Sequence, residues 1–141
     1  MGEQHSTQLL ITAKEAMKYA YAPYSNFSVG AAVLTSDGRI YSGCNIENAS
    51  YGATNCAERT AIFKAVSEGC SSISKIAVVC SSGHYAYPCG ICRQVMAEFA
   101  TEDMQIILED VDKGILELSL MDILPGAFTG KDIVADDKQE E

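Results

Sequence analysis

The sequence predicts an α/β protein with three layers, in which a mixed five-stranded β-sheet carries helices on both faces. Segments with the 3.6-residue spacing of amphipathic helices alternate with short apolar segments typical of strands. One of these, residues 75–80, is apolar on both sides, as expected for a strand buried inside a parallel sheet. The predicted order is αββαβαββα, and a sheet covered by helices buries the apolar face of every element.

The first predicted elements are a helix and a hairpin. Apolar residues recur at helical spacing over residues 6–21, with Ser6 or Thr7 as the expected N-cap and Pro23 ending the helix. Residues 31–34 and 39–43 then predict two strands. The Asp37-Gly38 pair between them supplies the positive φ angle that a tight hairpin turn requires.

The remaining elements follow from similar signals, after a polar and irregular stretch at residues 45–55. A helix is predicted to begin at Cys56 and to end before Gly69, which suits the position just past a helix C-terminus. The others, in chain order, are a strand at 75–80, a helix after Pro88 to about residue 100, strands at 105–109 and 115–118, and one or two helical turns at 119–124.

Length and composition indicate one domain over residues 1–130, followed by an acidic tail at 131–141. The formal net charge is −9, and the absence of a basic run disfavours binding to nucleic acid. No apolar stretch approaches 18 residues and no signal-peptide pattern opens the chain, so we expect a cytoplasmic protein without a membrane partner. A cytosolic chain of 141 residues keeps its six cysteines reduced, and Cys44, Cys70 and Cys80 are interpreted as bystanders.

Two short motifs carry the chemistry: Cys56-Ala57-Glu58 and Pro88-Cys89-Gly90-Ile91-Cys92. The three cysteines supply three thiolates for one Zn²⁺ and leave its fourth position open for water, as in catalytic zinc sites. The carboxylate of Glu58 is then placed to carry a proton to and from that water. This combination is typical of the zinc-dependent nucleobase deaminases.

Both motifs fall where a predicted helix begins. Helix N-termini carry partial positive charge, which lowers cysteine pKa values and offsets the negative charge of three thiolates. Arg59 is a candidate to donate hydrogen bonds to the cysteine sulfurs and to tune the water. Three alternatives remain: a closed structural zinc site completed by His84, a redox pair of Cys89 and Cys92, and Glu58 as a simple helix-dipole partner.

Four motifs in order resemble the small cytidine deaminases, over about residues 7–130. They are residues 22–32 (APYSNFSVGAA), 43–51 (GCNIENASY), 56–61 (CAERTA) and 88–94 (PCGICRQ), with residues 124–128 (LPGAF) as a further match.

The resemblance implies hydrolytic deamination of cytidine and 2′-deoxycytidine to the uridines and ammonia, in pyrimidine salvage. Such a hydrolase cleaves a C–N bond of a cyclic amidine: zinc-bound hydroxide attacks C4 of the base and Glu58 shuttles the protons. It also implies one Zn²⁺ per chain and a homotetramer with sites shared between subunits.

The resemblance assigns further residues to the substrate. Asn45 and Glu47 hold the ribose hydroxyls, and a carboxylate there repels a 5′-phosphate, which favours a free nucleoside. Phe27 packs against the base. The remaining implied substrate contacts are Ile46, Ala57, Tyr51 and Phe128, of which Tyr51 and Phe128 reach a neighbouring subunit's site. Gln94 is implied to contact the residues that bind the metal rather than the metal itself. Without the resemblance, Asn45 and Glu47 could equally be turn formers and Phe27 a core residue.

Three other functions stay open at this point. A deaminase for another cytosine compound, such as blasticidin S or a cytidine nucleotide, would share the metal motif. A non-catalytic zinc-binding interaction domain would keep the cysteines but would not need Glu58. A polynucleotide editor is disfavoured by the acidic charge.

Overall fold

The computed structural model describes residues 2–133. Its ten elements are α1 (Gly2–Met17), β1 (Val29–Thr35), β2 (Ile40–Cys44), a 3₁₀ turn η1 (Tyr51–Ala53), α2 (Ala57–Ser67), β3 (Ile73–Cys80), α3 (Gly90–Phe99), β4 (Ala100–Asp110), β5 (Gly114–Ser119) and α4 (Leu120–Ile123). Residues 134–141 of the predicted acidic tail lie outside the described residues.

The five strands form one mixed sheet in the order β2-β1-β3-β4-β5, which confirms the predicted fold class. β3 pairs with β4 in parallel and with β1 antiparallel, whereas β1–β2 and β4–β5 are antiparallel pairs. The parallel pair requires a crossover connection, and α3 supplies it. The helix therefore returns the chain to the end of the sheet at which β3 begins, so that β4 runs in the same direction as β3.

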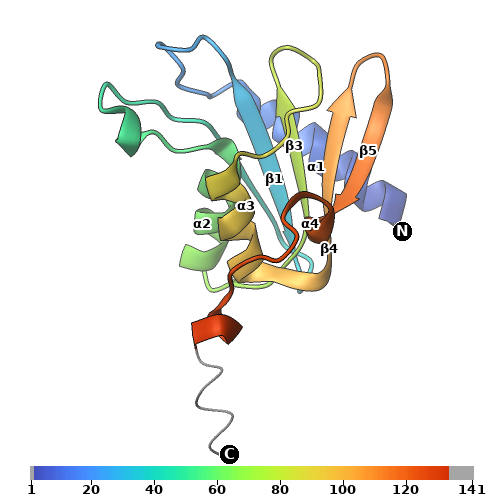
Figure 1. Ribbon diagram of the computed structural model, residues 1–141. Helices are drawn as coiled ribbons and strands as arrows, with labels where there is room; N and C mark the ends of the chain where they lie inside the picture. The colour runs from blue at the N-terminus through green and yellow to red at the C-terminus, as the bar shows by residue number, and fades with distance from the viewer. Residues whose placement is uncertain (1, 134–141) are drawn as a thin grey trace, which may run out of the picture.

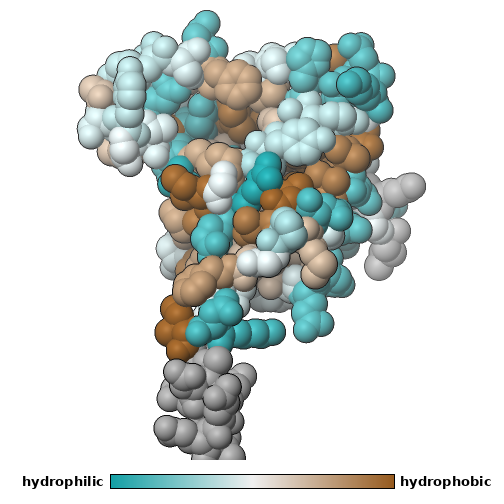
Figure 2. All heavy atoms as spheres, viewed as in Figure 1, coloured by the Kyte–Doolittle hydropathy of each residue, from teal (hydrophilic) through white to brown (hydrophobic). Residues whose placement is uncertain are grey.

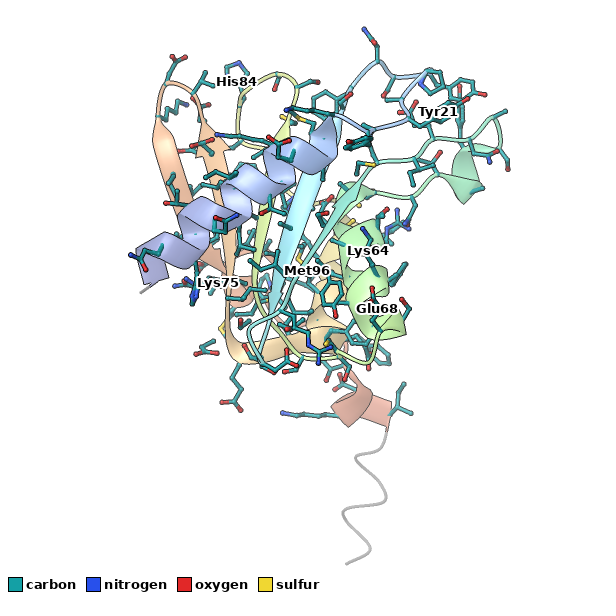
Figure 3. All side chains as sticks on the ribbon, turned by 180° about the vertical axis from the view of Figure 1, so that it is seen from behind. Tyr21, Lys64, Glu68, Lys75, His84 and Met96 are labelled. Atoms are coloured by element: carbon teal, nitrogen blue, oxygen red, sulfur yellow. The ribbon has the colours of Figure 1, made fainter. Side chains whose placement is uncertain are left out.

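The helices lie in two layers on opposite faces of the sheet. Figure 1 shows α2 and α3 in front of the strands, with α1 crossing behind them. The larger of two apolar clusters lies between the sheet and the α2–α3 layer and includes Met96 of α3, whose side chain is seen between the helices and the strands in Figure 3. The smaller cluster lies under α1 and includes Leu9 and Ile107.

The hairpin is confirmed, with Gly38 at φ 91°, and so is the end of α2 before Gly69, at φ 95°. The predicted bounds of the first helix were wrong, because the helix begins four residues earlier and ends at Met17 rather than near residue 21. The Ser6 hydroxyl donates to the carbonyl of Gly2 inside the helix instead of capping it. Beyond Met17, Tyr21 pairs with the backbone of Asn45 and Glu47, which takes this segment out of the helix.

Over the described residues, no helix is both long and apolar enough to cross a membrane. The six cysteines form no disulfide bond.

Candidate active site

Two of the three motif cysteines occupy the same structural position, the N-cap of a helix. Cys56 caps α2 with φ −75° and ψ 155°, and Cys89 caps α3 with φ −68° and ψ 168°. The backbone is extended at both residues and turns helical immediately afterwards. Cys92 follows in the first turn of α3, so two helix N-termini point their partial positive charge at the same spot.

The three sulfur atoms converge although the cysteines are far apart in sequence. All three Sγ atoms lie within 4.8 Å of one another, and the Cys56 and Cys89 sulfurs are 3.8 Å apart. With Zn–S bonds of about 2.3 Å, tetrahedral geometry requires sulfurs about 3.8 Å apart. The donor set and its spacing therefore fit a zinc ion with three protein ligands.

No fourth cysteine, histidine or carboxylate joins this cluster among residues 2–133. The Nδ1 atom of His84 instead lies 3.2 Å from the Asp110 carboxylate, at the turn between β4 and β5. His84 thus does not complete a closed structural site.

The groups around the Cys56 sulfur favour a thiolate at this residue. The hydrogen bond with Cys92 lowers the pKa of Cys56 to about 5, and the nearby Arg59 guanidinium acts in the same direction. The same contact raises the pKa of Cys92. Arg59 donates from Nη2 to the Cys56 sulfur at 3.2 Å, while its buried Nε has no partner among the described residues.

Glu58 lies in the first turn of α2, directly beside the sulfurs, and is only 5% exposed. Burial raises its pKa to about 7. A carboxyl group with a pKa near neutrality can both accept and donate a proton at physiological pH, which is the property required of a general acid–base.

A cavity of about 480 Å³ opens onto Glu58, Cys56 and Cys89. This volume suits a small organic ligand. The lining residues are Ser25, Phe27, Val29, Asn45, Glu47, Thr54, Asn55, Cys56, Ala57, Glu58, Val78, Tyr85, Ala86, Tyr87 and Cys89. The cavity thus combines an apolar wall with polar groups at one side and the metal-binding thiols at the other.

Asn45 and Glu47 are held firmly at the polar side of this cavity. The Asn45 amide accepts from the Val29 N–H at 2.9 Å and donates to the Phe27 carbonyl at 2.8 Å. Glu47 accepts from the backbone N–H groups of Tyr24 and Ser25 and from the Ser25 hydroxyl. These bonds, led by that of the hydroxyl, lower the pKa of Glu47 and keep it a carboxylate.

Six of the predicted site residues do not line the cavity: Cys92, Arg59, Ile46, Tyr51, Phe128 and Gln94. Ile46 lines a different hollow together with residues of α1, β2 and α2, and its backbone pairs with Tyr21 and Asn55. Tyr51 is 76% exposed and Phe128 is 61% exposed. The Gln94 side chain donates to the Phe128 carbonyl at 2.7 Å.

The sequence reasoning missed the loop before Cys89, which contributes Tyr85, Ala86 and Tyr87 to the cavity wall. Its position directly before a metal-ligand motif was the available signal. It also missed Ser25, whose hydroxyl orients Glu47. The signal there was a hydroxyl in the Tyr24-Ser25-Asn26-Phe27 segment.

The fold and the three-thiol centre with its buried carboxylate define a zinc-dependent deaminase. Residues 3–108 match the family model described as the cytidine and deoxycytidylate deaminase zinc-binding region, and the chain belongs to this family of hydrolases.

Comparisons with individual proteins support the assignment to this family. The chain is 50% identical over 126 residues to a cytidine deaminase of Sporosarcina psychrophila, covering 89% of this chain and 93% of that protein. It is 52% identical over 127 residues to the cytidine deaminase of Halalkalibacterium halodurans, covering 89% and 96%. The crystal structure of cytidine deaminase from Burkholderia pseudomallei superposes with a TM-score of 0.81 at 47% identity, covering 86% and 98% of the two chains.

Proposed function

We propose that this protein hydrolyses cytidine and 2′-deoxycytidine to uridine and 2′-deoxyuridine with release of ammonia, in pyrimidine salvage. The observation that carries the proposal is the buried Glu58 beside three converging thiols, at the end of a cavity of about 480 Å³. The similarity to proteins named cytidine deaminases supports the choice of substrate.

In this proposal Cys56, Cys89 and Cys92 hold one Zn²⁺ per chain. The bound ion supplies Lewis-acid activation of a water molecule. Glu58 would accept a proton from that water and deliver it to N3 of the base as the hydroxyl group adds to C4. It would then take the proton of the resulting C4 hydroxyl and give it to the amino group, which leaves as ammonia while the C4 carbonyl forms. Arg59 offsets the negative charge of the thiolates through its hydrogen bond to the Cys56 sulfur.

Four of the proposed substrate contacts are residues that line the cavity. Phe27 and Ala57 lie against the base, while Asn45 and Glu47 bind the ribose hydroxyls. Asn45 retains one N–H and further acceptor capacity after its backbone bonds, so it can still bind a sugar hydroxyl. The permanent charge of Glu47 repels a 5′-phosphate, which favours the nucleoside over the nucleotide.

We further propose a homotetramer of single-domain chains in the cytoplasm. Figure 2 shows hydrophobic residues gathered over α3 and α4 on the face that carries the two active-site helices. The exposed apolar residues of this region include Ile91 at 61%, Met121 at 77% and Phe128 at 61%. Subunit contacts would cover them and would bring Tyr51 and Phe128 towards neighbouring sites.

The test is ammonia release from cytidine, with CMP, cytosine and blasticidin S in parallel, by wild type, Glu58→Gln and Glu68→Gln. We expect turnover of cytidine and a loss of 10²-fold or more, on the order of 10⁴-fold at most, in Glu58→Gln with zinc retained. Glu68→Gln is the matched control, because Glu68 is exposed at the other end of the same helix (Figure 3).

Turnover of another compound in place of cytidine would overturn the assigned roles of Asn45 and Glu47. Wild-type protein that holds zinc but is inactive, or full activity of Glu58→Gln, would instead favour a non-catalytic zinc-binding domain.

A further inference from the structure

Two consecutive residues of α3 hold the C-terminal segment against the helix that carries Cys89 and Cys92. Arg93 donates from Nη1 to the carbonyl of Ile123, at the end of α4, at 2.7 Å. Gln94 donates to the carbonyl of Phe128, also at 2.7 Å. Figure 1 shows α4 beside α3 and the segment after α4 passing across it.

Arg93 makes a second contact that Gln94 lacks. Its Nε donates to the carbonyl of Pro88 at 2.7 Å, on the peptide unit that leads into Cys89. The Pro88 side chain is fully buried, and the proline ring fixes its φ angle. The backbone at Pro88 is therefore constrained, and the hydrogen bond to its carbonyl orients the peptide unit that joins Pro88 to Cys89. One guanidinium thus connects α4 to the residue before a metal ligand.

The cysteine next to this contact is the one that packing holds least. Cys92 is buried and Cys56 is half-buried, whereas Cys89 is exposed. Burial cannot fix the Cys89 side chain, so its position depends on the backbone at residues 88–89. The planar guanidinium offers several donors in a rigid fork, which suits two carbonyls at once, whereas a lysine supplies a point charge on a flexible stem.

We propose that Arg93 is a positioning residue for the metal site. It orients the Pro88–Cys89 peptide unit and thereby determines the position of the Cys89 sulfur. Because Arg93 also bonds the end of α4, this position depends on how α4 packs. Arg93 contacts neither substrate nor metal in this arrangement. The inference rests on the proposed role of Cys89 as a zinc ligand.

The test measures zinc binding in purified wild type, Arg93→Met, Arg93→Lys and Ser119→Ala, by competition with a chromophoric chelator. Loss of a residue that orients a ligand typically weakens metal binding 10- to 100-fold, and we expect this loss in Arg93→Met. Arg93→Lys, which keeps the charge but on a single donor nitrogen, should be intermediate.

Ser119→Ala is the control for packing of the C-terminal segment. Ser119 caps α4 through a capping box with Asp122, so its loss loosens α4 without removing the Arg93–Pro88 bond. Its zinc affinity should stay within about threefold of wild type. In the zinc-loaded variants at position 93, kcat should fall while KM for cytidine changes little.

Wild-type zinc affinity in Arg93→Met would overturn the proposal. So would an equal loss of zinc in Ser119→Ala at a matched melting temperature, because the effect would then come from the C-terminal segment alone. Wild-type protein that binds no zinc would overturn both this proposal and the proposed function, and that result appears before any variant is compared.

Discussion

The absence of a side chain at Gly43 allows α2, the helix that carries Glu58, to pack closely against β2. The Gly43→Ala substitution should move α2 and β2 apart. A Cβ atom at this position would lie 2.5 Å from the Ala61 nitrogen, 2.8 Å from the Ala57 carbonyl oxygen and 2.8 Å from the Thr60 Cβ. All three atoms belong to α2, and two are backbone atoms, so no rotamer change relieves the contact. The added methyl group must displace the helix or the strand.

The size of the displacement follows from these distances. Non-bonded heavy atoms rest about 3.5–4.0 Å apart, so α2 and β2 must separate by about 1 Å. Overpacking of this kind costs about 1–3 kcal/mol of stability. Glu58 and Cys56 lie on the first turn of the displaced helix, and a misplacement of about 1 Å lowers catalytic rates by about 10²-fold.

The assay is kcat/KM for cytidine per folded, zinc-loaded molecule, with the folded fraction taken from urea titrations. Two alanine variants serve as controls. Gly30→Ala places a Cβ 2.0 Å from the Ala13 carbonyl of α1, which carries no proposed site residue, so it should destabilise the protein without a specific loss of activity. Gly52→Ala meets no atom within 4 Å and should change neither quantity.

Wild-type kcat/KM in the folded fraction of Gly43→Ala would refute this reasoning. An equal loss per folded molecule in Gly30→Ala would refute it as well, since the effect would then be general destabilisation.

Two further predictions concern carboxylates with lowered pKa values. Ser25→Ala removes the hydroxyl that stabilises ionised Glu47, so the Glu47 pKa should rise towards its ordinary value. KM for cytidine should increase about 3- to 10-fold, and the increase of KM at acid pH should begin at a higher pH than in wild type. An unchanged KM profile from pH 4 to 7 would contradict the role of Ser25. The Asp110 pKa is lowered by N–H groups of Asp112 and Lys113 and by His84, so its contribution to stability is present above its unfolded pKa and is lost as pH falls through its folded pKa. Asp110→Asn should therefore lower the urea midpoint at pH 7 and differ less from wild type at pH 3, and a constant difference would argue against the assignment.

The sequence was sufficient for elements whose signals are local. The Asp37-Gly38 turn and the residues flanking α2 specify their own backbone conformation, so the hairpin and this helix were predicted within a few residues. The first helix was misplaced because its ends depend on distant partners. Glu117 of β5 accepts from the Ser6 hydroxyl, and Tyr21 pairs with Asn45 and Glu47. Neither contact has a signature near residues 6–21.

The candidate site likewise contains residues that a local sequence pattern predicts and residues that no such pattern predicts. The spacing of Cys56, Cys89 and Cys92 with Glu58 is a chemical pattern that the chain displays directly, and their side chains do converge. The Ser25 side chain contacts Glu47 through its hydroxyl, and the Arg93 guanidinium donates to the carbonyls of Pro88 and Ile123. Such partners are set by how loops and the C-terminal segment fold back on the helices, which local patterns do not report.

In the proposed mechanism, the placement of the cysteines accounts for how a zinc site with three thiolates could activate water. Zinc with three thiolates carries a formal charge of −1, which opposes the loss of a proton from water. Cys56 and Cys89 each cap a helix whose N-terminus contributes roughly half a positive charge. Arg59 adds a full positive charge 3.2 Å from the Cys56 sulfur. Together these positive charges exceed the formal excess of one negative charge, which favours ligands at two helix N-termini beside an arginine over ligands on open loops.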